Sequence, residues 1–243
     1  KNVITSLMAD NNDIVTPWQE QLAELSVVVG GLAHEIKNPL STITLNLKLL
    51  GEDLERFDDD EHRRLLRRLL CVQEETARIQ RILDDFLQYA GKVELHAADT
   101  DICEVVREMR DFFTPQAEAS RIVFRTQLPA QPVICKIDVN LIKQALLNLM
   151  INAVQAMNTG GELIVRVTTK GAFANIEVID SGPGIPPENL NLIFKAYFST
   201  KKSGSGLGLP TARRILKEHG GDMIVESEQG KGTCFLLKLP IVH

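Results

Sequence analysis

The sequence has few cysteines and no cysteine motif. Cys71, Cys103, Cys135 and Cys234 are the four cysteines among 243 residues, and no two of them form a Cys-x-x-Cys pair. This spacing disfavours both a zinc site built on paired cysteines and a disulfide framework, so the thiols are expected to be reduced. Such cysteine usage is typical of a cytoplasmic protein.

The sequence also lacks a long apolar run and an excess of positive charge. No apolar run approaches the roughly 20 residues that a membrane helix needs, and residues 1–13 lack the pattern of a secretory signal. The net charge of -5 gives no reason to expect a nucleic acid as partner. We therefore expect neither membrane insertion of this chain nor binding to DNA or RNA. The chain begins with Lys1, which suggests a fragment whose upstream part has been removed.

What is present is ordinary for a globular protein of one or two domains, with 44% hydrophobic and 24% charged residues. In the first part of the chain, apolar residues recur at steps of three and four, which predicts an amphipathic helix. They are Leu22, Leu25, Val29, Leu32, Ile36, Leu40, Ile43, Leu47, Leu50 and Leu54. Thr16 and Pro17 predict the start of this helix, which is expected to run to about residue 57, and Pro39 predicts a kink inside it.

A second helix is predicted after a turn and cap at residues 58–60. Its apolar positions form a heptad-like repeat that only a threonine interrupts, and Gly91 is expected to cap its end. The repeat comprises Leu65, Leu69, Val72, Thr76, Ile79, Leu83, Phe86 and Ala90. Two long helices joined by a short turn form an antiparallel hairpin, and one hairpin cannot fully cover two such stripes. Dimerisation into a four-helix bundle is therefore expected.

One histidine stands apart from the apolar stripe of the first helix. His34 lies two residues from Leu32 and from Ile36, which is about 200° of helical rotation, so it is expected on the polar side with Glu35 beside it. A core histidine would lie on the stripe instead. This placement favours a reactive side chain over the alternative of a generic coiled coil that carries no chemistry.

From about residue 100 the sequence pattern becomes mixed α and β. Helices are predicted at 102–119, 139–157 and 207–220, and strands at 122–127, 133–136, 163–169, 174–180, 223–228 and 233–239. The last strands follow one another without intervening helices. This order favours an α+β fold, with a mixed sheet covered by helices on one face, over a doubly wound parallel sheet.

Polar residues suited to a nucleotide cluster in this second part. Asn148 and Asn152 are four apart, so their amide oxygens share a helix face, and such oxygens suit a Mg²⁺ that bridges phosphates. Asp180 ends a strand and precedes two glycines, so its carboxylate could accept from the exocyclic amine of adenine and would reject guanine. Taken alone, the asparagine pair also fits an ordinary helix surface, and the Asp-Ser-Gly sequence fits an ordinary turn.

Gly204, Gly206 and Gly208 precede and open a helix, so backbone N–H groups and the helix dipole could meet phosphate oxygens. Their spacing matches neither the dinucleotide Gly-x-Gly-x-x-Gly motif nor the P-loop. Residues 198–205 are short, polar and cationic, and they predict a mobile lid in which Thr200, Lys201 and Lys202 reach the phosphates.

Several of these segments together resemble a known family. His34-Glu35-Ile36-Lys37-Asn38-Pro39 resembles the phosphoacceptor box of sensor histidine kinases. Segments 148–152, 180–184, 194–198 and 204–209 resemble the nucleotide-binding boxes of the same family, in its order and rough spacing, and residues 230–233 resemble its last nucleotide box. The resemblance covers about residues 20–243.

The resemblance implies a domain organisation and a fold. It implies an N-terminal linker at 1–16, a dimerisation and histidine phosphotransfer domain at 17–92, a linker at 93–99 and a catalytic ATP-binding domain at 100–243. The last domain would be the two-layer sandwich of the histidine-kinase, gyrase and heat-shock ATPase superfamily. The chain would act in the cytoplasm, or as the cytoplasmic part of a larger membrane-anchored sensor.

The resemblance also implies the site residues. The catalytic residues would be His34, Glu35 and Asn38, and the ligand of Mg²⁺ would be Asn152. The residues that bind ATP would be Asn148, Asn152, Asp180, Gly182, Gly184, Thr200, Lys201, Gly204, Gly206, Leu207, Gly208 and Thr233. Gln155 departs from many relatives, which carry lysine or arginine there, and Lys201 or Lys202 could supply that charge instead.

The function implied is an ATP-dependent protein-histidine kinase core. It would be a homodimer that phosphorylates itself on His34 and passes the phosphoryl group to an aspartate of a response regulator receiver domain. Asn38 would support a second, phosphatase activity toward that regulator. Two alternatives stay open: an ATP-driven conformational clamp without a phosphohistidine, and a dimeric scaffold that binds ATP only as a structural ligand. A zinc protease is excluded because Asn38 stands where its motif requires a second histidine.

Overall fold

The computed structural model describes residues 17–54, 59–91, 94–201 and 204–242, with side chains described from residue 36 onward. The chain divides into two compact units, residues 1–92 and 93–243. Each unit is described by itself below.

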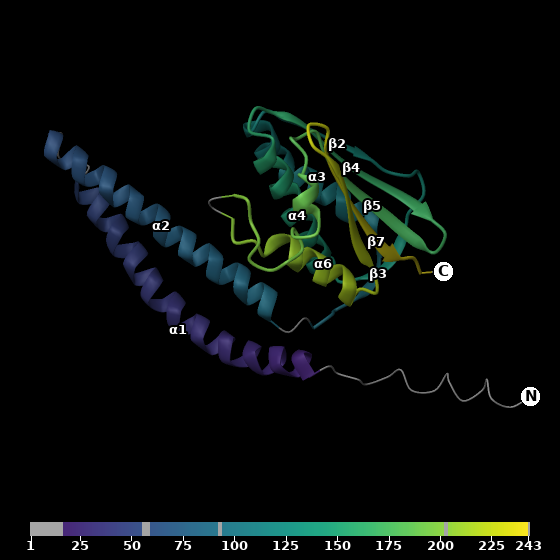
Figure 1. Cartoon of the computed structure of the whole chain (residues 1–243), viewed down its shortest axis with the longest axis horizontal. Coiled ribbons are helices and arrows are strands. Elements are labelled where there is room, and N and C mark those ends of the chain that lie inside the picture. The colour runs from purple at the N-terminus through teal and green to yellow at the C-terminus, as the bar shows by residue number, and fades with distance from the viewer. Residues whose placement is uncertain (1–16, 55–58, 92–93, 202–203, 243) are drawn as a thin grey trace, which may run out of the picture. The chain divides into compact units, whose positions relative to one another are not determined.

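The first unit is a pair of long helices, α1 (Pro17–Leu54) and α2 (Asp60–Ala90) (Figure 1). Asp59 caps α2 as predicted, because its carboxylate accepts the backbone N–H groups of Glu61 at 3.0 Å and His62 at 2.8 Å. Gly91 follows the last turn and donates its N–H to the carbonyl of Leu87 at 2.7 Å. Helix α1 ends at Leu54, before the predicted end, and residues 55–58 lie outside the described residues, as does Thr16.

Side-chain contacts join α1 and α2 in antiparallel order, which confirms the predicted hairpin. The amide of Gln73 donates to the carbonyl oxygen of Leu47 at 3.0 Å, and the amide of Gln80 donates to the hydroxyl of Thr44 at 3.2 Å. Further along, the ammonium of Lys37 pairs with the carboxylate of Asp84 at 2.5 Å. Leu40 of α1 and Leu69 of α2 are buried.

Helix α1 continues through Pro39 and curves along its length (Figure 1). Proline has no N–H to donate to the carbonyl four residues earlier. Beyond it, the hydroxyls of Ser41, Thr42 and Thr44 donate to the carbonyls four residues before them at 2.8, 3.2 and 2.9 Å. Such bonds bend helices, so the curvature has two local causes close to residue 34.

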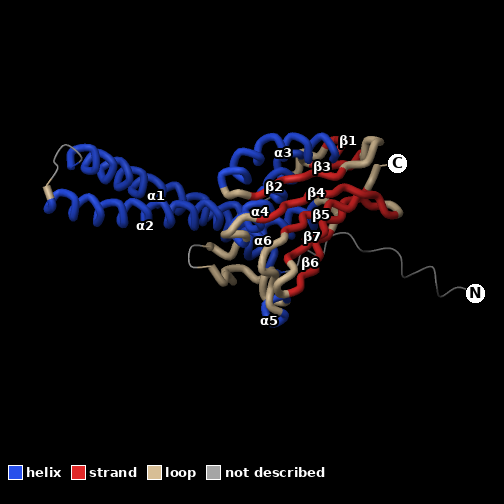
Figure 2. The backbone as a smooth tube through the Cα atoms, turned by 90° about the horizontal axis from the view of Figure 1, so that it is seen from above, coloured by secondary structure: helices blue, strands red, loops and turns tan. Residues whose placement is uncertain are grey.

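The second unit contains a five-stranded sheet in the order β2 (Ile122–Gln127), β4 (Gly161–Lys170), β5 (Phe173–Asp180), β7 (Gly232–Pro240) and β6 (Asp222–Glu228). Strands β2 and β4 are parallel, and the other neighbours are antiparallel. Helices α3 (Ile102–Ala119), α4 (Val139–Ala156) and α6 (Gly208–Glu218) lie together on one side of the sheet (Figure 2). The mixed two-layer arrangement is therefore as predicted.

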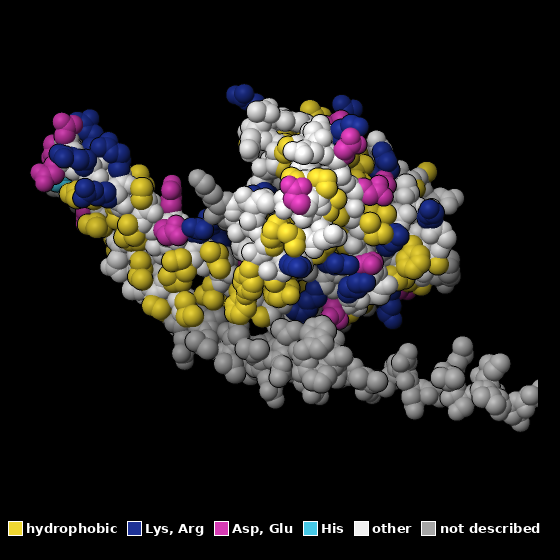
Figure 3. Space-filling model, in the orientation of Figure 1, with side chains coloured by type: hydrophobic (Ala, Val, Ile, Leu, Met, Phe, Trp, Pro, Cys, Tyr) yellow, Lys and Arg dark blue, Asp and Glu magenta, His cyan; other side chains and the backbone are white. Residues whose placement is uncertain are grey.

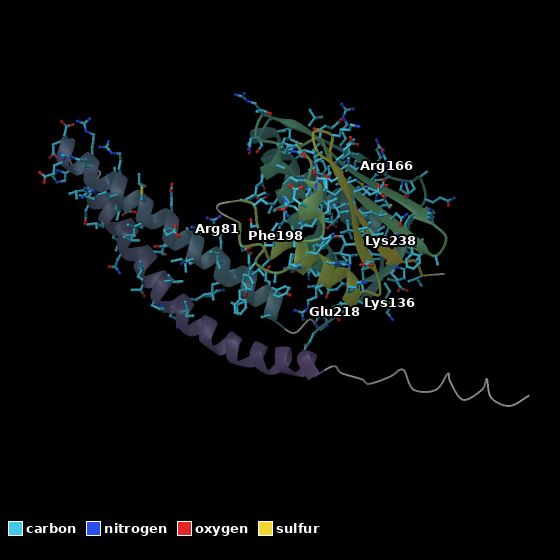
Figure 4. All side chains as sticks on the ribbon, viewed as in Figure 1. Arg81, Lys136, Arg166, Phe198, Glu218 and Lys238 are labelled. Atoms are coloured by element: carbon cyan, nitrogen blue, oxygen red, sulfur yellow. The ribbon has the colours of Figure 1, made fainter. Side chains whose placement is uncertain are left out.

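The core of this unit lies between the helices and the inner sheet face. Side chains alternate along β5, where Ile176 and Val178 point inward and are buried. They pack with the inward faces of the other strands and with apolar residues of the helices, among them Leu163, Val165, Leu237, Ile142, Leu146, Leu149 and Leu216. The outer sheet face carries charged side chains such as Arg166 and Lys238, which are labelled in Figure 4.

Two elements of this unit were not predicted. Strand β1 (Ala98–Asp101) pairs antiparallel with β3 (Ile134–Ile137) and begins inside the predicted linker 93–99. Its sequence, Ala-Asp-Thr-Asp, has no apolar alternation, so backbone pairing with β3 is what makes it a strand. The short helix α5 (Pro187–Leu190) was also missed, because a single turn leaves no periodic pattern.

None of the helices in the described part of the chain combines the length and the apolar character needed to cross a bilayer. All four cysteines are free, as predicted. Burial raises the pKa of the Cys103 and Cys135 thiols to about 11, with the nearby charge of Asp101 adding to the effect. Buried neutral thiols of this kind are structural rather than reactive.

Candidate nucleotide-binding site

Asp180 lies at the end of β5 and is buried, with 6% of its surface exposed. Its Oδ1 atom accepts the N–H of Gly182 at 2.9 Å, which closes the turn that the sequence predicted. Burial raises the pKa of this carboxyl above its ordinary value, while the N–H groups of Gly182 and Thr233 and the charge of Lys201 act in the opposite direction. A buried carboxylate in this position is a strong acceptor for a donor on a bound base.

The β6–β7 hairpin holds the loop after Asp180 in place. The hydroxyl of Ser227 accepts the N–H of Ile185 at 2.8 Å and donates to the carbonyl of Gly232 at 2.9 Å. Gly184 has φ +72°, and a Cβ atom on it would lie 2.2 Å from the carbonyl oxygen of Glu228, so only glycine fits there. Thr233 is buried and pairs directly with Asp180 across the two strands.

The glycine-rich loop packs against helix α4 and against the residues before the lid. The amide of Asn148 donates to the carbonyl oxygen of Gly208, the first residue of α6, at 3.2 Å. Gly206 has φ +71°, and a Cβ atom there would lie 2.6 Å from the carbonyl carbon of Tyr197. Leu207 is buried and gives no side-chain cap to α6, so the first N–H groups of this helix are not satisfied by a capping side chain. The N-terminus of α6 is therefore suited to binding an anion.

Lys201, in the segment between α5 and α6, reaches to helix α4. Its ammonium donates to Oδ1 of Asn152 at 3.1 Å and to Oε1 of Gln155 at 2.8 Å. Burial lowers the pKa of Lys201, and the negative charge of Asp180 raises it in part. A cationic group is therefore present beside Gln155. It is the ammonium of Lys201, which is hydrogen-bonded to the side chain of Gln155.

Asn152 is suited to a divalent cation. Its amide oxygen accepts the ammonium of Lys201 at 3.1 Å, so a divalent cation on this oxygen would take the place of that ammonium. Among the described side chains, no group of three or more His, Cys, Asp and Glu residues is placed to hold a metal ion. Mg²⁺ commonly takes only one or two protein oxygens and completes its shell with water and phosphate, so a single amide oxygen fits that ion.

Several predicted site residues are placed less closely. Thr200 is exposed, and Gly204 lies beside the hydroxyl of Ser199, while Lys202 is outside the described residues. His34 and Glu35 belong to α1 of the other unit, and their side chains lie outside the described residues. Asn38, also in α1, is exposed.

Two contributors were not predicted. Ser227 joins the loop after Asp180 to the β6–β7 hairpin, and no local motif marks it because it stands in an ordinary strand sequence. Gln155 was noted only as a departure, yet its oxygen holds the Lys201 ammonium at 2.8 Å. The spacing of Gln155, three residues after Asn152, could have indicated a shared helix face.

Comparisons with known proteins agree with this geometry. Residues 137–243 match the family described as histidine kinase-, DNA gyrase B- and HSP90-like ATPase. Residues 24–92 match the His Kinase A (phospho-acceptor) domain. The second unit is thus an ATP-binding domain of this ATPase class.

Among individual proteins, sensor histidine kinase ZraS of Klebsiella oxytoca is 36% identical over 229 residues, which cover 93% of this chain and 48% of that protein. The chain spans about half the length of such curated relatives. Full-length ShkA in complex with AMPPNP is similar in structure, with a TM-score of 0.73, 26% identity and coverage of 89% of this chain and 46% of that one. Histidine kinase ThkA in complex with response regulator protein TrrA gives a TM-score of 0.67, 27% identity and coverage of 95% and 68%.

The chain belongs to the sensor histidine kinases. It contains a helical hairpin of the phosphoacceptor type followed by the family's α/β ATPase domain.

Proposed function

We propose that this chain is the kinase core of a two-component system, which phosphorylates itself on His34 with ATP and passes the phosphoryl group to an aspartate of a response regulator. The observation that carries this proposal is the grouping of Asp180, Asn152 and Lys201 beside a glycine-rich helix start. We further propose that the domain boundaries lie at 17–92 for the phosphotransfer domain and 100–243 for the catalytic domain, with linkers at 1–16 and 93–99.

The adenine end of the nucleotide would bind at Asp180. The carboxylate would accept from the exocyclic amine, and the Gly182 and Gly184 backbone would let the flat base approach closely. Thr233, which pairs with Asp180, would line the same end. Guanine presents a carbonyl oxygen where adenine has the amine, so two acceptors would face each other and GTP would bind poorly.

The phosphates would lie toward the glycine-rich loop and Lys201. The N–H groups from Gly204 to Gly208, including those of Gly206 and Leu207, would meet phosphate oxygens at the positive end of α6. Thr200 and Lys201 would contact the terminal phosphates, and Asn148 would keep α6 in register with α4. Asn152 would hold Mg²⁺, which supplies charge neutralisation between the phosphates when bound.

At the phosphoacceptor end, neutral His34 would attack the γ-phosphorus with one ring nitrogen. A nitrogen–phosphorus bond forms, the bond from the γ-phosphorus to the bridging oxygen breaks, and ADP leaves with that electron pair. Glu35 would hold the N–H of the other ring nitrogen, fix the tautomer and stabilise the positive charge that develops on the ring. The phosphoryl group would then pass to an aspartate of a receiver domain. The structure of the similar kinase ThkA in complex with response regulator protein TrrA supports this step.

Asn38 would act on the return reaction. It follows His34 by one helical turn, so its exposed amide could orient a water molecule toward the phosphoaspartate of the regulator. This would give the chain a phosphatase activity that does not need His34 as nucleophile.

The hairpin is proposed to dimerise into a four-helix bundle. Large apolar side chains along it are exposed in the single chain, among them Ile43 at 46%, Leu50 at 51%, Leu70 at 49%, Val72 at 50% and Ile79 at 45%. Figure 3 shows hydrophobic side chains along the visible face of the hairpin. Exposed apolar surface of this extent is covered in a stable protein, and a second copy offers the matching face. The cytoplasm, which holds ATP and response regulators, is the proposed location.

The test is incubation with ATP labelled at the γ-phosphate. The chain should acquire label that is acid-labile and alkali-stable, and His34→Gln should abolish it. His62→Gln, a substitution of another histidine in the same hairpin, is the matched control and should keep the label. Asn152→Ala should lose the label while His34 is intact. Hydrolysis of ATP without a labelled protein would favour the clamp ATPase instead.

A further inference from the structure

Helices α4 and α6 lie antiparallel, and hydrogen bonds at both ends of α6 join it to α4. At the nucleotide end, Asn148 of α4 donates to the carbonyl of Gly208, the first residue of α6. At the opposite end, the backbone N–H of Asp138, the cap of α4, donates to Nε2 of His219, the cap of α6, at 2.9 Å. Asn152 lies about 20 Å further along α4 than Asp138. The two helices are therefore hydrogen-bonded to each other near the proposed ATP site and again at the far end of α6. We call this hydrogen-bonded pair, α4 with α6, the frame.

His219 uses both ring nitrogens inside this network. Its Nδ1 lies 2.7 Å from the carbonyl oxygen of Ile215, which can only accept, so Nδ1 carries the proton. Nε2 accepts from the N–H of Asp138, which can only donate. The ring is 8% exposed, and its two hydrogen bonds define a single arrangement of the imidazole, with Nδ1 facing Ile215 and Nε2 facing Asp138. Lys136 and Glu218, labelled in Figure 4, lie at the same end of the second unit.

Asp138 joins a third segment to the two helices. Its Oδ1 caps α4 by accepting the N–H groups of Asn140 at 3.0 Å and Leu141 at 3.3 Å. Its Oδ2 accepts the N–H of His96 at 3.0 Å, and His96 belongs to residues 94–97, which lead from α2 into β1. Burial tends to raise the pKa of Asp138, but the N–H groups of His96, Leu141 and Asn140 outweigh it and lower the pKa. The carboxylate is therefore ionised.

We propose that Asp138 and His219 are positioning residues that couple residues 94–97 to the ATP site through the frame of α4 and α6. This inference rests on the proposed function, because it concerns how that ATP site is regulated. Capping α4 uses only Oδ1 of Asp138. The other oxygen, Oδ2, binds the N–H of His96, and the backbone N–H of Asp138 binds the imidazole of His219 at the end of α6, so Asp138 joins two segments that are far apart in the sequence. Since residues 94–97 are the covalent path from the helical hairpin, a displacement there acts on both helices that carry phosphate-binding residues.

Coupling between two sites is reciprocal, so nucleotide binding must also act on residues 94–97. Backbone amide exchange in the full chain measures this directly, with and without AMPPNP. The amide of His96 should exchange more slowly when AMPPNP is bound. Bound AMPPNP with unchanged exchange at 94–97 would overturn the coupling, whereas failure of AMPPNP to bind at all would instead refute the proposed ATP site.

Asp138→Asn separates the cap from the coupling. Asparagine keeps an oxygen for the N–H groups of Asn140 and Leu141, but it presents an NH₂ donor to the N–H of His96. We expect exchange of the His96 amide to rise about tenfold, the loss of one charge-assisted hydrogen bond, and its response to AMPPNP to disappear. Asp101→Asn is the matched control, since Asp101 caps α3 and accepts from Val133 with the same oxygen. It should leave the response intact.

His219 gives an independent pair of variants. The amide nitrogen of asparagine falls near Nδ1 and can donate to Ile215, but it provides no acceptor for Asp138. Glutamine is longer, and its oxygen can reach the position of Nε2. His219→Gln should therefore retain the response of His96 to AMPPNP, and His219→Asn should lose it. Equal responses in two folded variants would contradict the role of His219, and if both unfold, the exchange measurement on the unsubstituted chain still decides the coupling.

Discussion

Replacing Asp180 by asparagine should change which base the site accepts. The carboxylate is 6% exposed, so solvent screens its interaction with a bound base very little. A hydrogen bond to such a charged acceptor contributes roughly 1.5–3 kcal/mol, so its loss weakens ATP binding by about 10-fold to 150-fold. The oxygen that accepts the N–H of Gly182 can be kept by asparagine, so the turn after β5 should persist.

The new amide also changes the preference between nucleotides. Its NH₂ group can donate to the carbonyl oxygen of guanine, which the carboxylate repels. GTP should therefore bind more tightly relative to ATP. The ratio of the affinity for ATP to the affinity for GTP should fall by a larger factor than the affinity for ATP itself. Competition of each nucleotide against a fluorescent ATP analogue measures both values. Asp111→Asn, on the surface of α3, is the control and should change neither.

Acid should weaken ATP binding to the unsubstituted chain through the same group. The pKa of Asp180 is raised, chiefly by burial, so its carboxyl takes up a proton at a higher pH than an ordinary aspartate does. The protonated form loses its charge as an acceptor, and ATP affinity should decline as the pH falls through that raised pKa. An unchanged ATP-to-GTP ratio in Asp180→Asn, together with no acid limb, would refute the adenine assignment.

Three further predictions concern the lid, the loop and the hairpin. The pKa of Lys201 is lowered, chiefly by burial, so its ammonium loses the proton at a lower pH than an ordinary lysine does. The affinity for ATP should therefore decline as the pH rises through that lowered pKa, whereas the affinity for adenosine, which has no phosphates, should not. Lys201→Arg should remove the decline. Gly206→Ala places a Cβ atom 2.6 Å from Tyr197 at a positive φ, and should lower the stability of the loop by about 1 kcal/mol or more, seen as weaker ATP binding with the fold retained by circular dichroism. Asn38→Ala should spare labelling of His34 and reduce dephosphorylation of the regulator; loss of both activities would make Asn38 structural.

Much of the fold followed from local patterns. The stripe from Leu40 to Leu54 and the heptad repeat of α2 predicted the hairpin, because the spacing of apolar residues on a helix decides which face is buried. Asp59 was recognisable as a cap for a similar reason, since its hydrogen bonds reach only two and three residues ahead. Strand β1 was missed because its four residues have no pattern of their own and depend on β3, more than 30 residues later.

In the candidate site, too, local features were predicted from the sequence and long-range contacts were not. Asp180, Asn148, Asn152 and the glycines were predicted as site residues from the sequence because they stand in short segments with a recognisable spacing. The partnership of Lys201 with Gln155 was not, because it joins residues 46 positions apart, and neither was the link from Asp138 to His219, which spans 81. Residue types and periods specify elements and reactive groups locally; which of them meet depends on chain packing over long separations, and that emerges only when the whole core forms.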